Sequence, residues 1–469
     1  MDYKVTVGIE VHCELKTKNK IFSPSRVSYG SMANTNTNVI DLGYPGVLPE
    51  LNKEVLEYAI RACKVLNLNI TRDMHFDRKN YFYADNPKNF QITQNETPIG
   101  TNGYVEIEID GVKKKIEILE MHIEEDTCKS VHSNKNSLLD FNRAGVRLIE
   151  IVTKPCIYSA EEAVKYLEKL RELLLYANVS DCKIEEGSMR CEPNVSISKT
   201  DKLGTKVEVK NIGSISSVGE AIKYEVKRQM EILENGEMLK EQTRRFDDKT
   251  RTTILMRYKE TGNDYRYFPE PDLPFVHLTD EFINNSLKDL SRMPDERRET
   301  YKKAGILPIN IEKIIANKEL SDYLEKFLDI NLVIASNLLL GDIEAYLNKN
   351  GKLLNETHLT DSKFRELVNK LDSGKITNKI FKEILPELME TDTKIDEILD
   401  NKGLNLSCDD SLVEVIIDKV LEENEKMVND YKNGNERVIK AMMGLVMKEA
   451  KGKINPSVAM QKLTEKLDA

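Results

Sequence analysis

The chain has 469 residues, of which 32% are charged and 40% hydrophobic, and its formal net charge is −10 at pH 7. This length exceeds what one ordinary core supports, so two or three domains are expected. The excess of acidic residues excludes a protein that binds nucleic acid over its whole surface. Any nucleic acid must therefore bind at local basic patches.

Signals for export or membrane insertion are missing from the sequence. The first residues lead straight into a strand pattern, without the apolar segment of a signal peptide. No apolar run approaches the roughly 20 residues that span a bilayer. The seven cysteines include no C-x-x-C pair, which argues against a disulfide framework or a zinc knuckle. We therefore expect a cytoplasmic protein with no membrane partner.

The first predicted element is a strand over residues 3–15, in which apolar and polar residues alternate. Because successive side chains of a strand point to opposite faces, Glu10, His12 and Glu14 share the polar face. Two carboxylates beside an imidazole suit a metal or phosphate site. The solvated face of an antiparallel sheet has the same pattern, so this strand alone leaves both interpretations open.

Three helices are predicted among the strands of the N-terminal part, over residues 53–66, 163–175 and 218–233. The second helix follows a capping box, in which Ser159 precedes Glu162 by three positions. Helices on one side of an antiparallel sheet make an α+β domain. We expect a cradle of this class over residues 1–292.

Strand patterns end near Met293, and amphipathic helical stretches joined by short loops follow. They predict an all-α helical domain over residues 293–404 and a small helical tail domain over residues 405–469. The expected helices cover residues 294–304, 311–328, 332–347, 361–371, 377–389, 411–431, 436–450 and 456–467. Basic residues of the last two helices suit either an RNA contact or a solvated face: Arg437, Lys440, Lys448, Lys451, Lys453, Lys462 and Lys466.

Carboxylates recur at strand positions in four further segments, over residues 121–126, 148–152, 189–197 and 206–211. Glu150 lies inside a nearly apolar run, where an unpaired carboxylate costs several kcal/mol. Oxygen ligands with one histidine and no cysteine cluster favour Mg²⁺ or Mn²⁺, and neighbouring basic residues favour a phosphate-bearing substrate. Together these segments favour a functional acidic site over a merely solvated face.

The usual nucleotide-binding motifs are absent, including the P-loop, the Rossmann fingerprint and the kinase signatures, so any ATP site must be of an unusual kind. Aromatic and basic residues alternate over residues 76–91 and 243–272. This pattern suits stacking on bases and pairing with phosphate, and a core edge with surface arginines has the same composition.

Seven motifs run in order along the chain: VGIEVH at 7–12, NTNTN at 34–38, FDRKNYFY at 76–83, LIEIV at 148–152, EGSMRCE at 186–192, VKN at 209–211 and DYRYFPEPD at 264–272. They resemble the B subunits of the glutamine-dependent aspartyl/glutamyl-tRNA amidotransferases, the GatB/GatE family. The helical C-terminal part resembles the small YqeY-like proteins. The resemblance covers the full length of the chain.

The resemblance implies an ATP- and Mg²⁺-dependent carbon–nitrogen ligase with a kinase-like site on the cradle domain. ATP would phosphorylate the side-chain carboxylate of Glu-tRNA(Gln) or Asp-tRNA(Asn), and ammonia would displace the phosphate. The implied partners are the A subunit of the amidotransferase, a glutaminase that supplies ammonia through a channel, its C subunit, and misacylated tRNA, which the helical domains would bind.

Two other functions compete with this one. A non-catalytic RNA-binding and assembly subunit would have a purely structural acidic face. A Mg²⁺-dependent phosphohydrolase of small molecules agrees less well with a long helical tail that ends in basic residues.

The resemblance also implies residue roles. Metal binding falls to Glu10, His12, Glu124, Glu125 and Glu150, and nucleotide contacts fall to Arg78, Tyr81, Tyr83, Glu192 and Glu208. Since phosphorylating a carboxylate brings two anions together, cations must offset the repulsion, and the candidates are Lys79, Arg190 and Lys210. Some members carry a cysteine zinc motif where this chain has Ser23, Ser25, Asn38 and Asp41, so no zinc is expected. Glu14 is expected to be ordinary surface.

Overall fold

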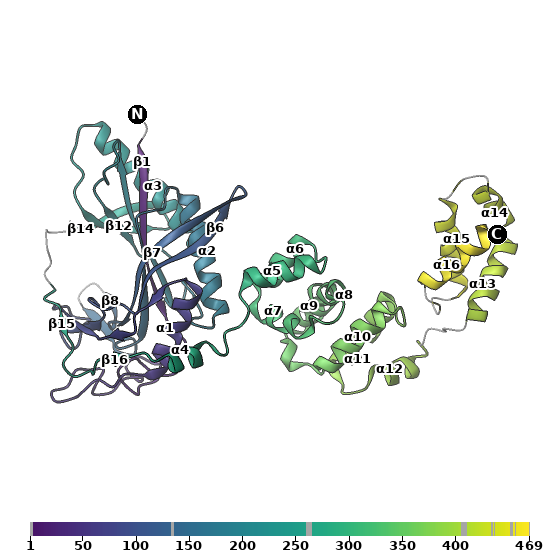
Figure 1. Ribbon diagram of the computed structural model, residues 1–469, viewed down its shortest axis with the longest axis horizontal. Helices are drawn as coiled ribbons and strands as arrows, with labels where there is room; N and C mark the ends of the chain where they lie inside the picture. The colour runs from purple at the N-terminus through teal and green to yellow at the C-terminus, as the bar shows by residue number, and fades with distance from the viewer. Residues whose placement is uncertain are drawn as a thin grey trace. The chain divides into compact units, whose positions relative to one another are not determined.

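The computed structural model describes residues 3–132, 136–258, 265–404, 410–432, 435, 437–450, 454 and 456–468. It divides into two compact units, Met1–Pro294 and Asp295–Ala469 (Figure 1). The division lies next to the boundary predicted after residue 292, whereas the boundary after residue 404 stays a prediction. Asp264, Glu436, Lys451 and Lys453 lie outside the described residues.

A large sheet organises the first unit. Its described strands are β1 (Lys4–Glu14), β2 (Asn69–Ile70), β6 (Gly100–Ile109), β7 (Val112–Glu125), β10 (Arg147–Thr153), β11 (Met189–Ser198), β12 (Val207–Lys210), β13 (Gln242–Asp247) and β14 (Thr252–Tyr258). Their order across the sheet is β14-β13-β12-β11-β1-β10-β7-β6-β2. The first strand of the chain thus lies in the middle of the sheet, between β10 and β11.

Neighbouring strands of this sheet are antiparallel, as expected, except for β12 and β13, which run parallel. The helix α3 (Ile215–Glu234) connects these two strands. A parallel pair needs such a crossover connection, because the chain must return to the same end of the sheet. The sequence predicts the helix but not this change of direction.

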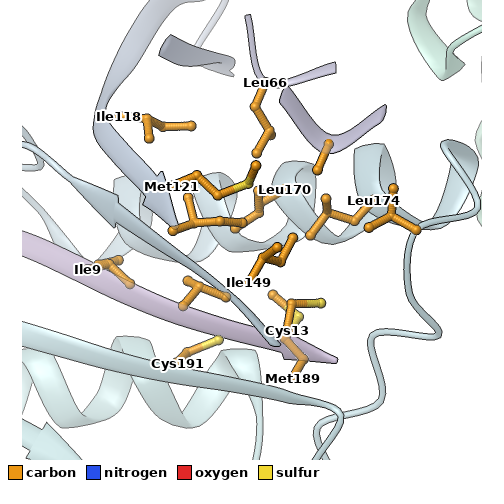
Figure 2. Packing of buried hydrophobic residues seen from close by; sticks show 14 of the residues in the cluster. Ile9, Cys13, Leu66, Ile118, Met121, Ile149, Leu170, Leu174, Met189 and Cys191 are labelled. Atoms are coloured by element: carbon orange, nitrogen blue, oxygen red, sulfur yellow. The ribbon is translucent and has the colours of Figure 1, made fainter. Parts of the chain in front are cut away.

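The predicted alternation of β1 is confirmed. Val7, Ile9, Val11 and Cys13 are buried in the core, and the polar residues between them lie on the other face. The apolar side chains of β1 meet those of β10, β11 and α2 (Ala160–Tyr176), as Figure 2 shows for Ile9 and Cys13. This core fixes the backbone from which the polar face projects.

Helices cover the apolar face of the sheet. α2 contacts β6, α3 contacts β11, and the two helices lie against each other (Figure 1). Ser159 caps α2, since its Oγ accepts a hydrogen bond of 3.1 Å from the Glu162 backbone N–H. The other helices of this unit are α1 (Lys53–Val65) and α4 (Asp280–Leu287). The α+β class expected from the sequence is confirmed.

Three small sheets accompany the large one in the described part of the first unit. They join β15 (Phe268–Pro269), β4 (Asp77–Asn80) and β5 (Phe90–Thr93); β16 (Val276–His277) and β3 (Asp73–Met74); and β8 (Lys129–His132) and β9 (Ser137–Asp140). The first is tied to β7, because Gln91 Nε2 donates to the Glu125 carbonyl at 2.7 Å. This contact places the aromatic and basic residues of β4 beside the polar end of β7.

The described residues of the second unit form helices and no strands, as expected. The α-helices are α5 (Pro294–Lys303), α6 (Pro308–Ala316), α7 (Lys318–Leu324), α8 (Leu332–Leu338), α9 (Glu344–Asn350), α10 (Asp361–Asp372), α11 (Asn378–Glu390), α12 (Ile395–Lys402), α13 (Asp410–Glu423), α14 (Glu425–Lys432), α15 (Val438–Glu449) and α16 (Pro456–Asp468). Short helical turns lie at Glu325–Phe327, Leu339–Ile343 and Leu354–Glu356. None of the described helices is both long and apolar enough to cross a membrane.

Three of the predicted helices are wrong in extent, because each is interrupted. Asn317 is extended (φ −111°, ψ 97°), and its side chain caps α7 by accepting from the Leu320 N–H at 3.1 Å. Gly341 has non-helical angles (φ −109°, ψ −105°) between α8 and α9. Asn424 separates α13 from α14. Hydrophobic periodicity continues across such breaks, so it does not reveal them.

The last helices share a core of their own, formed by buried residues between Val413 and Leu467. Two of the basic residues in the tail are paired within it: Lys462 Nζ lies 2.6 Å from Glu414, and Lys466 pairs with Asp418. Ion pairs within the tail therefore account for the positive charges of these two residues.

We predict that Glu225 anchors α3 to the sheet. Its carboxylate is fully buried and accepts hydrogen bonds from Gln229 at 3.1 Å and from Thr253 of β14 at 3.0 Å, with Arg228 also paired to it. Glu225→Ala leaves Arg228 without its carboxylate, which should cost about 3–5 kcal/mol of unfolding free energy in urea titrations.

The matched control is Glu231→Ala on the same helix. Its carboxylate is exposed and lies 4.0 Å from Lys227, so the loss should stay below about 1 kcal/mol. Equal losses for the two variants would contradict the anchoring role of Glu225.

Candidate functional site

The polar face of the large sheet brings side chains from neighbouring strands into rows. His12 of β1 stands opposite Arg190 of β11 and Glu150 of β10, and Glu150 stands opposite His122 of β7. Directly opposite residues of antiparallel strands project from the same face. These four side chains therefore form one row across four strands.

Three members of the row, His12, Glu150 and His122, form a tight group with Glu124 of β7, which we name the histidine cluster. His12 Nε2 lies 3.4 Å from Glu124 Oε1 and 3.3 Å from Glu150 Oε2. His122 Nε2 lies 3.0 Å from Glu150 Oε2 and 3.8 Å from Glu124 Oε2. Each carboxylate is thus shared by two imidazole rings.

Opposite charges set the protonation states of this cluster. Burial acts to lower the pKa of His12 and His122, but the two carboxylates outweigh it and raise both pKa values to about 10. Burial acts to raise the pKa of Glu124, but hydrogen bonds to the two imidazoles lower it to about 2, and the pKa of Glu150 is likewise well below its usual value. In the protein alone, the two carboxylates therefore favour the protonated form of both imidazoles.

A second group, the glutamate cluster, consists of Glu10, Glu192 and Glu208. Lys210 Nζ lies 2.7 Å from Glu192 and 3.0 Å from Glu208, and Asn194 Nδ2 donates to Glu10 Oε1 at 2.9 Å. One ammonium group is thus shared by two of the three carboxylates, and the third accepts from an amide.

The two clusters are close enough to interact. The pKa of Glu10 is raised by burial and by the negative charges of Glu150, Glu208 and Glu192. The described part of the polar face therefore carries an excess of negative charge that a divalent cation could offset.

Both clusters have the geometry and the donors for a divalent cation. Within each of the sets His12, Glu124, Glu150 and Glu10, Glu192, Glu208, one ligand atom per residue lies within 4.8 Å of the others. Buried polar atoms there also lack hydrogen-bond partners in the described part of the chain: His12 Nδ1, His122 Nδ1 and Asn194 Oδ1. Carboxylate oxygens with an imidazole suit Mg²⁺ or Mn²⁺.

The three predicted cations lie around these clusters. Lys210 belongs to the glutamate cluster. Arg190 stands in the row of His12, and its Nη2 donates to Asp126 Oδ2 at 2.8 Å. Lys79 lies 4.9 Å from the centre of the Tyr265 ring, and although burial acts to lower its pKa, the charges of Glu124 and other neighbours raise it.

Other predicted residues are not brought into either cluster. Glu125 points to the opposite side of β7 from Glu124, where it pairs with Lys88 and accepts from the Ile92 N–H at 2.9 Å. Arg78 makes two hydrogen bonds to Glu270, of 2.6 and 2.8 Å, and so fastens β4 to the segment after β15.

The two predicted tyrosines lie near the end of β4. The Tyr81 hydroxyl lies 3.4 Å from Gln91 Oε1, and burial raises the pKa of Tyr81, whereas the Tyr83 side chain is exposed. The roles predicted for Arg78, Tyr81, Tyr83 and Glu125 stay predictions.

Two residues of the site were not predicted from the sequence. His122 completes the histidine cluster, and Asn194 contacts Glu10. Both were detectable, because His122 precedes Glu124 by two positions and Asn194 follows Glu192 by two, so the period of a strand places each on the same face as a predicted residue.

Comparisons with known proteins agree with one another. A model described as the GatB/GatE catalytic domain matches residues 5–284, which include both clusters, and a model described as the GatB domain matches residues 322–467. The chain is 46% identical to the aspartyl/glutamyl-tRNA(Asn/Gln) amidotransferase B subunit of Ligilactobacillus salivarius, over 100% of this chain and 99% of that protein. It is 44% identical to the B subunit of Geobacillus thermodenitrificans, over 100% of both chains.

We predict that Glu150→Gln weakens binding of Mn²⁺. The variant keeps the shape of the side chain but removes the charge that faces both imidazoles, so the Mn²⁺ affinity measured by titration calorimetry should fall at least about tenfold. Glu117→Gln is the control, since Glu117 is an exposed residue of β7 paired with Lys154 at 2.7 Å. Equal Mn²⁺ affinity in the two variants would remove Glu150 from the metal site.

Proposed function

Because the chain belongs to the family of aspartyl/glutamyl-tRNA(Asn/Gln) amidotransferase B subunits, we propose that its acidic sheet face activates the side-chain carboxylate of a misacylated tRNA with ATP. An oxygen of this carboxylate attacks the γ-phosphorus of ATP, and ADP leaves. Ammonia then attacks the carbonyl carbon of the acyl phosphate, phosphate leaves, and the amide of Gln-tRNA(Gln) or Asn-tRNA(Asn) results.

The proposed assembly supplies the functions that the acidic face does not provide. The A subunit, a glutaminase, releases ammonia from glutamine, the C subunit is the third member of the complex, and the helical second unit of this chain binds the tRNA. The described part of the chain provides the acidic clusters and the cations around them.

The observation that carries this proposal is the adjacency of two carboxylate-rich clusters on one rigid sheet. Mg²⁺ bound at such clusters would polarise the γ-phosphate and offset the repulsion between it and the substrate carboxylate. The residues of both clusters lie on strands rather than on loops, so the sheet holds them in place before any substrate arrives.

The cations contribute charge from fixed positions. Glu192 and Glu208 hold the ammonium of Lys210, and Asp126 holds the guanidinium of Arg190. Lys79 belongs to β4, and the negative charges of Glu124 and Glu150 act to raise its pKa against the effect of burial. These three groups are placed to stabilise negative charge on the transferred phosphoryl group.

Aromatic residues stand beside Lys79. The ring of Tyr265 lies 6.2 Å from that of Tyr81 and 6.0 Å from that of Tyr267, in edge-to-face geometry. An acyl phosphate is hydrolysed when water reaches it, so an apolar wall beside the reacting groups protects the intermediate.

We predict that Glu10→Ala and Glu150→Ala each abolish ATP-dependent amidation by the complex reconstituted with the A and C subunits. Each variant removes a carboxylate from one of the two clusters. Glutamine hydrolysis by the glutaminase should remain largely intact because it takes place in the A subunit. Binding of tRNA should remain largely intact because the proposal assigns it to the helical second unit. Unchanged amidation in both variants would favour the non-catalytic assembly role instead.

We also predict that α15 contributes to tRNA binding. Arg437, Lys440 and Lys448 are exposed, and their spacing places them on one side of the helix. Replacing all three by Ala should weaken tRNA binding and reduce its salt dependence, by about 0.9 in log–log slope for each phosphate contact that the substitutions remove.

The control for this surface is the pair Lys462→Ala and Lys466→Ala, because both lysines are already paired with acids of α13. A salt slope that is unchanged by the triple substitution would assign α15 to packing alone.

A further inference from the structure

A cleft of about 640 Å³ lies at the end of β1, where Glu14 is one of its lining residues. The loops over residues 27–31 and 184–188 line it, together with Glu14 and Arg147. Glu14 follows His12 by two residues and projects from the same face of β1, about 7 Å further along the strand. Glu14 therefore connects the cleft to the strand face that carries His12.

Glu14 is not the ordinary surface residue that the sequence indicates, since its side chain is only 22% exposed. Its nearest charged partner in the described residues is Arg147, whose Nη1 lies 3.9 Å from Glu14 Oε2, too far for a hydrogen bond. The Glu14 carboxylate can thus accept a hydrogen bond from a ligand.

Arg147, which also lines the cleft, has a buried N–H group without a hydrogen-bond partner among the described residues. Its side chain is 7% exposed, and it is held by hydrogen bonds to Thr17 from Nε at 2.8 Å and from Nη2 at 2.6 Å. Its remaining nitrogen, Nη1, is buried without a hydrogen-bond partner among the described residues. A buried guanidinium N–H without a partner is costly, so an acceptor from a ligand is expected there.

We propose that Glu14 binds the α-ammonium group of the aminoacyl residue on the tRNA, and that Arg147 Nη1 donates to the neighbouring ester carbonyl oxygen. This inference rests on the proposed function, because that function makes an aminoacyl ester the substrate. In such an ester the ammonium and carbonyl groups are on adjacent carbon atoms. One ligand could therefore contact both Glu14 Oε2 and Arg147 Nη1, which lie 3.9 Å apart.

The spacing along β1 agrees with this assignment. The α-ammonium and the side-chain carboxylate of a glutamyl or aspartyl group are separated by a few carbon–carbon bonds. With the ammonium at Glu14, the substrate carboxylate reaches toward His12, about 7 Å back along the strand. The ribose and the terminal base then occupy the cleft, whose volume lies within the range of small-molecule sites.

The charge of the cleft favours a cationic group over a triphosphate. Acidic residues outnumber basic ones among those that line it. A triphosphate would be repelled by this lining, whereas an ammonium group gains a charge-assisted hydrogen bond. The nucleotide phosphates belong instead beside the cations of the two clusters.

The test compares two substrates in the complex reconstituted with the A and C subunits. One is Glu-tRNA(Gln), and the other is the same tRNA with its glutamyl amino group acetylated, which keeps the side-chain carboxylate and the ester but removes the ammonium. For the unmodified protein, kcat/KM of ATP-dependent amidation should be about 10- to 100-fold lower with the acetylated substrate, the size of one charge-assisted hydrogen bond.

Glu14→Gln should lower kcat/KM for the free substrate by a similar factor and leave the acetylated substrate nearly unaffected, so that the discrimination disappears. A loss of folding alone would reduce kcat/KM for both substrates by the same factor. The control is Asp181→Asn, which removes another carboxylate of the cleft, one paired with Lys16 at 2.9 Å, and should keep the full discrimination.

Two results would overturn the assignment: equal amidation of both substrates by the unmodified protein, or undiminished discrimination in Glu14→Gln. Failure of the proposed function gives a different result. In that case the unmodified complex does not amidate free Glu-tRNA(Gln) with ATP, or Glu10→Ala and Glu150→Ala both leave that activity unchanged.

Discussion

Repulsion between carboxylates on one face of the central sheet is the constraint on which the site depends. Antiparallel pairing of β1 with β10 and β11 places acidic side chains opposite or beside one another, so their charges must be offset locally. In the histidine cluster, two imidazoles with pKa values of about 10 balance two carboxylates. In the glutamate cluster one lysine pairs with two of the three carboxylates, and burial together with neighbouring negative charges raises the pKa of Glu10. Added positive charge would offset this negative charge.

The rest of the first unit keeps this repulsive arrangement in place. The apolar side chains of β1 are buried under α2 and α3, and this burial fixes the register of the strand, because a slip by one residue would exchange its apolar and polar faces (Figure 2). The small sheet that contains β4 and Lys79 is tied to β7 through Glu125, and the charge of Glu124 on β7 acts to raise the pKa of Lys79. Core packing and site geometry therefore depend on the same strands.

Polar residues with different binding properties follow one another along the polar face of β1. Glu10 and His12 belong to the two clusters that suit divalent cations, and Glu14 opens onto a cleft with a buried guanidinium. One strand thus presents, at alternate positions, two groups suited to divalent cations and one suited to an ammonium ion. In the proposed reaction, an aminoacyl ester with an acidic side chain would bring its carboxylate toward the first two and its ammonium to the third.

The sequence by itself determined the local properties of this protein. Alternation in β1 assigned Glu10 and His12 to one face, and the apolar run around Glu150 marked that carboxylate as one needing a partner, because side-chain period and burial cost are properties of neighbouring residues. The same period separates Glu124 from Glu125, yet only the structure shows that Glu125 pairs with Lys88 instead of facing the clusters.

Only the tertiary structure decided which strands are neighbours. The order β12-β11-β1-β10-β7 joins residues far apart in the chain. It brings His122 to the histidine cluster and Asn194 to Glu10, two contacts that no local sequence pattern predicts. It also gives Glu14 a buried arginine and a cleft in place of open solvent. Strand pairing is fixed by backbone hydrogen bonds and by burial over the whole core, and no local pattern in the sequence contains that information.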